Sequence, residues 1–165
     1  MQIPLIDADS GLPRILGWAD LIGDVFGLNV PQIFEVEQLK QLPAGTLGRG
    51  LADFLEQQQL TPIVTGPRRK QLHDSVHVLT GYDTDPIGEA EVQAFLLGAK
   101  FHPLQIILGL GIGYILSREG FSPAVRQRLW QAYRRGWNAT FDVDSWQPEQ
   151  QWQLSLVQVR EFYHV

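Results

Sequence analysis

The sequence predicts an all-α fold, a single-domain bundle of about seven or eight helices over residues 1–165. Apolar residues recur at intervals of three and four along nearly the whole chain, which is the periodicity of an amphipathic helix. Prolines and glycines interrupt this pattern at spacings typical of helix ends. With 165 residues, 44% of them apolar, the chain can bury a core. Because no repeat or linker divides it, we expect one domain.

The first half of the chain is expected to hold four helices. Thr46 is the predicted N-cap of the third helix, and a loop over 61–69 separates it from the fourth. The fourth covers about 69–79 and ends at Gly81. The apolar positions that define the first three are Ile15, Trp18, Ile22 and Val25, then Ile33, Val36 and Leu39, then Leu47, Leu51, Phe54 and Leu55.

The second half is expected to hold four more helices. Asp85 is the predicted N-cap of the fifth helix, with Pro86 in its first turn, where a missing N–H costs nothing. The sixth covers 103–116, and only 138–144 has any strand character. The apolar positions of the fifth, seventh and eighth helices are Val92, Phe95, Leu96 and Ala99, then Val125, Leu129, Tyr133 and Trp137, then Trp152, Leu156, Val159 and Tyr163.

The composition excludes several classes of protein. There are no cysteines, so disulfide scaffolds, thiolate zinc sites and iron–sulfur clusters are excluded. The net charge of −5 argues against nucleic-acid binding. The longest uncharged apolar run, 103–116, is too short for a transmembrane segment, and residues 1–10 have no basic residue of a targeting peptide. We expect a cytoplasmic protein that is able to contact a membrane peripherally.

The candidate chemistry lies around two histidines. Residues four apart lie on the same face of a helix, so His73 and His77 can present both imidazoles to one ion. His77 and Glu89 each lie about 6 Å from the expected turn over 81–85, at similar heights. If the two helices are antiparallel neighbours, these three ligands converge. Two histidines and one carboxylate leave an open coordination position, as catalytic zinc and non-heme iron sites require.

Asp74 is offset by about 100° from His73 around the helix, and three roles are open to it. It can ligate the metal, orient an imidazole, or act as a base toward metal-bound water, which makes it the candidate catalytic residue. The simpler interpretation of the histidine pair is a chance pair on the surface. The acidic neighbour and the carboxylate beyond the turn favour the metal site.

These residues resemble the signature of a known family. His73, Asp74 and His77, followed after eleven residues by Glu89, are similar to the signature of the Coq-four family of coenzyme Q (ubiquinone) biosynthesis proteins. The likeness covers about residue 30 to the end of the chain. Its other matching segments are 43–48 (PAGTLG), the Gly88–Glu89 pair, and 146–165, which contains Trp152 and Arg160.

The resemblance implies an all-helical homodimer that binds a divalent metal, with zinc the first choice and iron or magnesium as alternatives. It also implies a long apolar pocket for a polyprenyl tail. For family members in the quinone pathway it implies decarboxylation, with oxidation, at ring position one of a polyprenylated hydroxybenzoate. An older view of the family is a scaffold that organises quinone-biosynthesis enzymes, which are the implied partners. Without a mitochondrial presequence, the chain is expected to be a bacterial cytoplasmic member.

Two further features are compatible with a lipid or an anionic head group. Gly109 and Gly113 fall on one face of the expected helix 103–116, and Gly98 removes a side chain from the helix before it. A helix or an alkyl chain can approach such a strip, and close helix packing is the simpler explanation. Arg69 and Lys70 can hold an anion, although such basic runs are usually solvated. A second basic cluster comprises Arg126, Arg128, Arg134 and Arg135.

Three functions follow from these patterns. The first is a metal-dependent enzyme of quinone or prenyl-lipid metabolism. The second is a non-enzymatic prenyl-lipid-binding scaffold in which the metal is structural. The third, a generic metallohydrolase, fits less well, because its zinc-protease form has Glu beside the first histidine and Asp74 is one methylene shorter.

Overall fold

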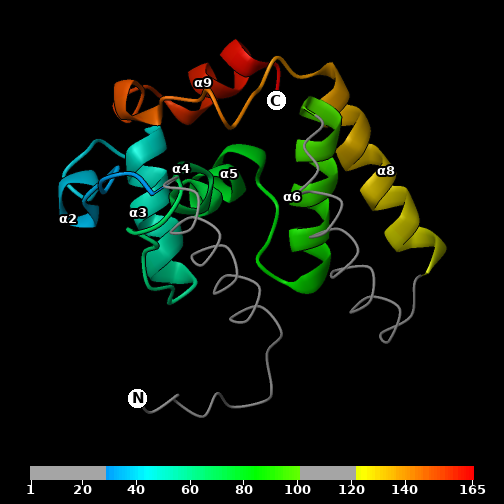
Figure 1. The fold of residues 1–165 in the computed structure, drawn as a ribbon, viewed down its shortest axis with the longest axis horizontal. Helices are drawn as coiled ribbons and strands as arrows, with labels where there is room; N and C mark the ends of the chain where they lie inside the picture. Colours follow the sequence, from blue (N-terminus) through cyan, green and yellow to red (C-terminus); the bar gives the residue numbers. More distant parts are fainter. Residues whose placement is uncertain (1–28, 101–121) are drawn as a thin grey trace, which may run out of the picture.

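The computed structural model describes residues 29–100 and 122–165, and within these two ranges it contains helices and no strand or sheet (Figure 1). The predicted all-α class is therefore confirmed. The expected helices over 15–25 and 103–116, including Gly109 and Gly113, lie outside the described residues. The elements are α2 (Val36–Leu39), α3 (Leu47–Gln57), α4 (Arg68–Gln71), α5 (His73–Thr80), α6 (Pro86–Ala99), α8 (Pro123–Asn138), the 3₁₀ helix η1 (Pro148–Gln150) and α9 (Leu156–Tyr163).

Local signals place the ends of the helices around the candidate site. The Thr46 hydroxyl accepts a hydrogen bond from the Arg49 N–H and caps α3, as predicted. Asp85 caps α6 by accepting from the Gly88 N–H at 2.7 Å. Gly81 ends α5 in the left-handed conformation, with φ of 78°, which a residue without a side chain adopts freely.

The predicted helix over 69–79 is wrong in one respect, because the chain forms two helices there. Leu72, with φ −88° and ψ −2°, separates α4 from α5. Gln71, only 1% exposed, explains the break. Its amide donates to the carbonyls of Val30 and Gly66 and accepts from the Ile33 N–H, so α4 is held by distant backbone groups.

Two other expectations near the C-terminus also need correction. The last helix begins at Leu156, because Ser155 and Gln158 form a capping box there, and Trp152 lies in the preceding turn. The segment 138–144 is not a strand. Its Thr140 N–H instead donates to the Tyr163 carbonyl, which ties the segment to the end of α9.

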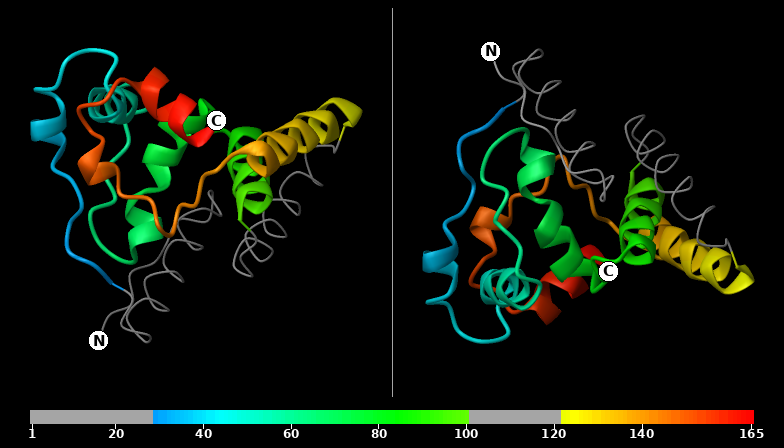
Figure 2. Two further views of the ribbon diagram at one scale, coloured as in Figure 1. Left: turned by 90° about the horizontal axis from the view of Figure 1, so that it is seen from above. Right: turned by 90° about the horizontal axis from the view of Figure 1, so that it is seen from below.

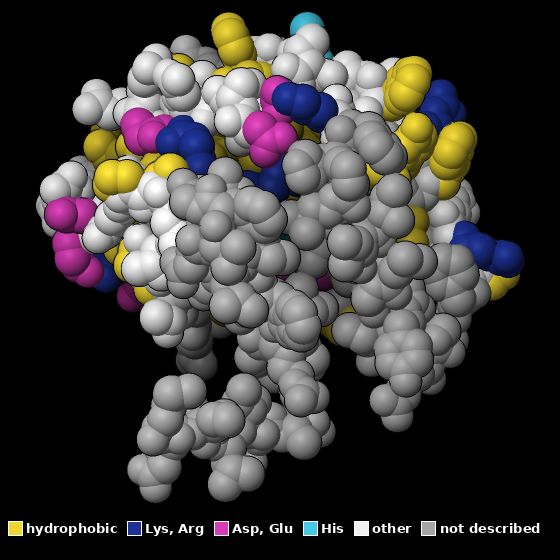
Figure 3. All heavy atoms as spheres, viewed as in Figure 1, with side chains coloured by type: hydrophobic (Ala, Val, Ile, Leu, Met, Phe, Trp, Pro, Cys, Tyr) yellow, Lys and Arg dark blue, Asp and Glu magenta, His cyan; other side chains and the backbone are white. Residues whose placement is uncertain are grey.

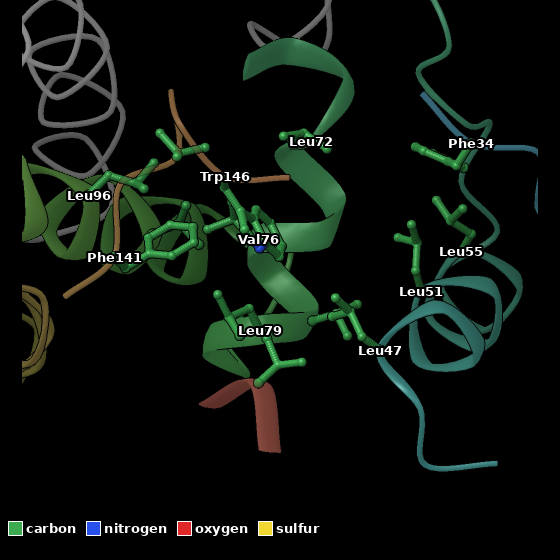
Figure 4. Close-up of a cluster of buried hydrophobic side chains, with 14 of the residues drawn as sticks. Phe34, Leu47, Leu51, Leu55, Leu72, Val76, Leu79, Leu96, Phe141 and Trp146 are labelled. Carbon is green, nitrogen blue, oxygen red and sulfur yellow. The ribbon is translucent and has the colours of Figure 1, made fainter. Parts of the chain in front are cut away.

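One hydrophobic core joins the N-terminal helices to the C-terminal segment (Figure 4). Leu47 and Leu51 of α3 face Val76 and Leu79 of α5, as the close-up shows. On the other side of α5 lie side chains from the chain end, with the Phe141 and Trp146 rings 5.1 Å apart. The helix carrying the candidate histidines is therefore packed from two directions.

Among the described helices, α6 and α8 form the most extensive contact, and Figures 1 and 2 show the two helices side by side. A Cβ on Gly98 would collide with the Tyr133 carbonyl, and a Cβ on Gly136 would collide with the Phe95 carbonyl. Each helix therefore uses a glycine to bring its backbone against the other. For Gly98, close packing is the explanation that the structure bears out.

Candidate metal centre

The candidate centre lies where α5 approaches the first turns of α6. Figures 1 and 2 together show that the two helix axes cross steeply, so the helices are not the antiparallel neighbours on which the spacing argument relied. The turn after Gly81 still brings the start of α6 beside α5. One nitrogen from each of His73 and His77 and one oxygen of Glu89 all lie within 4.8 Å of one another.

The Glu89 carboxylate bridges the two imidazoles. Its Oε2 lies 3.2 Å from His73 Nε2, and its Oε1 lies 3.1 Å from His77 Nε2. The two imidazole rings are tilted against each other, with centroids 4.8 Å apart. Each residue thus offers one atom toward the same small volume.

Hydrogen bonds on the far side of each ring favour tautomers that leave Nε2 available. His77 Nδ1 donates to the Tyr82 carbonyl at 3.0 Å, which fixes the proton on that nitrogen in a neutral ring. His73 Nδ1 lies 3.3 Å from Asp74 Oδ1. Metal-binding histidines are oriented by such partners in the same way.

His77 Nε2 is a buried polar atom that has no hydrogen-bond partner among the described residues. It lies within ion-pair distance of Glu89, but the angles do not make a hydrogen bond. In the neutral tautomer this nitrogen and the carboxylate oxygen are both acceptors, so a cation bound between them would satisfy both. The donor set of two imidazoles and a carboxylate fits zinc or iron better than magnesium, which prefers oxygen ligands.

The site is strongly polarised in the metal-free chain. Burial alone would lower the pKa of His73, but its hydrogen bonds with Asp74 and Glu89 raise that pKa to about 10. Burial alone would raise the pKa of Glu89, but its interactions, the largest of which is the hydrogen bond with His73, lower it to about 2. At neutral pH a proton therefore occupies His73 beside an ionised Glu89. A divalent ion bound here would replace that proton.

The three side chains differ in their exposure. His77 and Glu89 are buried, and the Phe54 ring of α3 stacks on His77 at 5.8 Å. The His73 side chain keeps 26% of its surface exposed. The site is therefore closed on the His77 side and accessible on the His73 side.

The other predicted site residues within the described ranges contribute no atom to this converging group. The Asp74 carboxylate accepts a hydrogen bond from His73 Nδ1, and none of its atoms is in the group of converging ligand atoms. Arg69 forms a bidentate ion pair with Asp144, at 2.9 and 3.1 Å, so its guanidinium already has an anionic partner. Lys70 lies beside it in α4. Anion binding by Arg69 and Lys70 stays a prediction.

Sequence reasoning named Arg135 and Arg160 but missed that they hold the C-terminal end of α5. Arg160 donates to the carbonyls of Leu79 and Val78, and Arg135 donates to the Thr80 carbonyl. No local signal pairs these arginines with α5, because they follow it by more than fifty residues.

The long apolar pocket implied by the resemblance stays a prediction. A half-open pocket of about 450 Å³ lies between α2 and the segment 149–154, against Gln38, Leu42 and Trp152. None of the predicted site residues lines it. No helix within the two described ranges combines the length and apolar character that a membrane span needs.

Comparisons with known proteins point to one group of relatives. The chain is 29% identical over 138 residues to the Ubiquinone biosynthesis protein COQ4 homolog, mitochondrial, of Danio rerio, covering 66% of the chain and 50% of that protein. It is 28% identical over 142 residues to the human protein of the same name, covering 77% and 53%. The chain thus spans about half the length of these curated relatives. The matches confirm the resemblance predicted from the motif residues.

A solved structure shares the fold. It is a crystal structure of a protein from Nostoc punctiforme whose name assigns it to ubiquinone biosynthesis. The match has a TM-score of 0.67 and 23% sequence identity, and it covers 92% of this chain and 79% of the Nostoc chain. No protein-family model matches the chain.

Proposed function

We propose that this chain, a relative of the Coq-four family of ubiquinone biosynthesis proteins, binds a divalent metal and acts with it on a polyprenylated ring substrate of quinone biosynthesis. The observation that carries the proposal is the convergence of His73, His77 and Glu89 around a buried nitrogen that has no hydrogen-bond partner among the described residues. Decarboxylation at ring position one of a polyprenylated hydroxybenzoate is the proposed activity. Zinc is the proposed ion, and iron is the alternative.

Each residue has a separate role in this proposal. His73, His77 and Glu89 hold the ion. Asp74 accepts from His73 Nδ1 and keeps that ring turned toward the ion, so it is a positioning residue. The Tyr82 carbonyl does the same for His77. When bound, a divalent ion supplies Lewis acidity that polarises a carboxylate or phenolic oxygen.

The exposed edge of His73 favours an enzyme over a purely structural metal site. Structural zinc sites are closed by four protein ligands, whereas a catalytic site keeps one position for an outside molecule. Here three side chains converge and one of them faces solvent. Substrate reaches the centre from the His73 side, because Phe54 covers His77.

A prenyl-lipid-binding scaffold that organises quinone-biosynthesis enzymes is the alternative function. The burial of His77 and Glu89 favours it, because a metal bound so deeply also stabilises the fold. A homodimer, a cytoplasmic location and enzyme partners of the quinone pathway remain predictions in both versions.

Elemental analysis and complementation test the proposal together. We expect the purified chain to contain about one metal ion, and the isosteric Glu89→Gln variant to lose it. His164→Ala, at an exposed histidine outside the cluster, is the matched control and keeps the metal. In a strain that lacks its own Coq-four protein, wild type and control restore the quinone and Glu89→Gln does not.

The outcomes separate the two functions. Full rescue by a folded Glu89→Gln variant without metal contradicts the enzymatic proposal and leaves the scaffold. Metal-free wild-type protein, with no ion taken up from added zinc, cobalt or iron(II), contradicts both. Mass spectrometry of lipids extracted from the purified protein identifies the bound prenyl compound.

A further inference from the structure

The helix α8 has two opposed faces. Its inner face, which carries Val125, Ala132 and Gly136, is buried, and Gly136 lies against the backbone of α6. These positions recur at intervals of seven and four, so they form one strip along the helix. The other side of α8 is therefore turned away from the core.

The outer side of α8 carries aromatic side chains that the fold does not cover. Trp130 is 59% exposed and Trp137 is 69% exposed. Tyr133 lies between them, with its ring 5.5 Å from that of Trp130 and 6.3 Å from that of Trp137. The three rings form a continuous row. Single exposed apolar residues are common on protein surfaces, but a continuous apolar patch indicates an interaction site.

Two arginines belong to the same strip. At 100° per residue, Arg126 and Arg134 fall on the side of α8 that carries the aromatic row. The strip is about 16 Å long at 1.5 Å per residue. We call it the outer α8 face, and it consists of Arg126, Trp130, Tyr133, Arg134 and Trp137.

The charge of this face is opposite to that of the whole chain. The chain carries a net charge of −5, whereas α8 contains four arginines and no acidic residue. Arg128 is paired with Glu91, and Arg135 donates to the Thr80 carbonyl. Within residues 29–100 and 122–165, no ion pair or hydrogen bond engages Arg126 or Arg134. Figure 3 shows hydrophobic and basic side chains together along the right-hand edge, over α8.

We propose that the outer α8 face docks on the head-group region of an anionic phospholipid bilayer. Tryptophan and tyrosine favour the membrane–water interface, because their rings are apolar and their N–H and O–H groups find polar partners there. Arginine adds attraction to lipid phosphates. The inference goes beyond the proposed function and does not depend on a bound metal.

Charge complementarity favours a bilayer over a second copy of the chain. In a two-fold symmetric contact the same patch lies on both partners. The outer α8 face would then gather four arginines, Arg126 and Arg134 of each copy, in one contact without an acidic partner on that face. An anionic membrane instead supplies the opposite charge, and it orients a chain whose net charge would otherwise be repelled.

Co-sedimentation of the full chain with vesicles tests this inference. We expect binding to vesicles of phosphatidylcholine mixed with phosphatidylglycerol, weakened by added salt, and little binding to phosphatidylcholine alone. Arg126→Gln combined with Arg134→Gln should lower the affinity about 30-fold, since each basic residue near an anionic surface contributes roughly fivefold. Lys40→Glu, on the far α2 side, makes the same change in net charge and should lower it far less.

The aromatic row is tested separately. Trp130→Ser combined with Trp137→Ser should abolish vesicle binding, while Val157→Ser, at an exposed apolar residue of α9, should leave it intact. The four side chains that these two double variants replace are exposed in the wild-type structure, so circular dichroism should show unchanged folding. Equal binding to neutral and anionic vesicles would overturn the proposal. A second result would also overturn it. If wild type binds no vesicles and runs as a dimer in gel filtration, and the tryptophan variant runs as a monomer, the face belongs to a protein partner.

Discussion

The Arg160 side chain of α9 donates a hydrogen bond from Nε to the Leu79 carbonyl, at 2.8 Å, at the end of the helix that carries both candidate histidines. The same guanidinium donates to the Val78 carbonyl at 3.1 Å. The last carbonyls of a helix have no partner within it and carry partial negative charge. The C-terminal helix thus fixes α5, although it lies far from the candidate metal ligands in sequence.

Replacing Arg160 by lysine should destabilise the fold although the charge is kept. An ammonium group is a point donor and does not reproduce the guanidinium's two bonds to neighbouring carbonyls. We expect a loss of roughly 1.5 kcal/mol in the free energy of unfolding for Arg160→Lys, and about 3 kcal/mol for Arg160→Ala. Urea unfolding measures both. Glu161→Gln, at the next and exposed position, is the control, and equal stability of all three variants would contradict the capping role.

Signals confined to a few neighbouring residues could be interpreted from the sequence. Thr46, Asp85 and Gly81 mark helix ends because each acts on backbone groups within four residues of itself. The histidine spacing is equally local. These features led directly to α3, to the start of α6 and to two of the three candidate ligands.

Contacts between distant segments could not be predicted in the same way. The break at Leu72 depends on the hydrogen bond from Gln71 to the carbonyl of Val30, about forty residues away. No sequence signal near α4 predicts that bond. The steep crossing of α5 and α6 depends on the conformation of the turn. Glu89 still meets the two histidines although the helices are not antiparallel. A residue in the first turn of a helix can approach a neighbouring helix at many crossing angles.

The glycine contact between α6 and α8 predicts a large effect of a single methyl group. Gly98→Ala and Gly136→Ala each place a Cβ against a rigid backbone carbonyl, so the helices must separate. We expect each to destabilise the chain by about 2–3 kcal/mol, despite alanine's helix propensity, which is better by about 1 kcal/mol. Thermal or urea unfolding provides the measurement.

The double variant and a control sharpen this test. Because one separation of the helices relieves both collisions, Gly98→Ala with Gly136→Ala should cost less than the sum of the two. Gly50→Ala in α3 meets only the Val78 side chain, at 3.2 Å, and should change stability by less than about 1 kcal/mol. Strict additivity of the two substitutions would argue against a shared contact.

Stability should fall in acid through the ion pair of Arg68 and Glu149. Burial alone would raise the pKa of Glu149, but the hydrogen bonds from Arg68 bring it below its ordinary value of 4.5. Since the folded pKa is lower than the unfolded one, the stabilisation is present above pH 4.5 and is lost as pH falls through the folded value.

Glu149→Gln isolates this contribution. Its free energy of unfolding should lie below that of wild type near neutral pH by less than about 1 kcal/mol, because the pair is partly exposed, and the gap should close in acid. Urea unfolding over a pH series measures the difference. A gap that persists unchanged below the folded pKa would show that the glutamate acts through packing and not through its charge.

Asp74 should tune the affinity for the metal without being a ligand. Its carboxylate accepts from His73 Nδ1, and such orienting partners typically contribute 10- to 100-fold to metal affinity. In a zinc or cobalt titration we therefore expect roughly that loss for Asp74→Asn and a complete loss for Glu89→Gln. Asp53→Asn, at a surface pair with Arg49, should bind like wild type. If Asp74→Asn loses the metal as completely as Glu89→Gln, Asp74 ligates directly. If its affinity is unchanged, the contact with His73 plays no part in holding the ion.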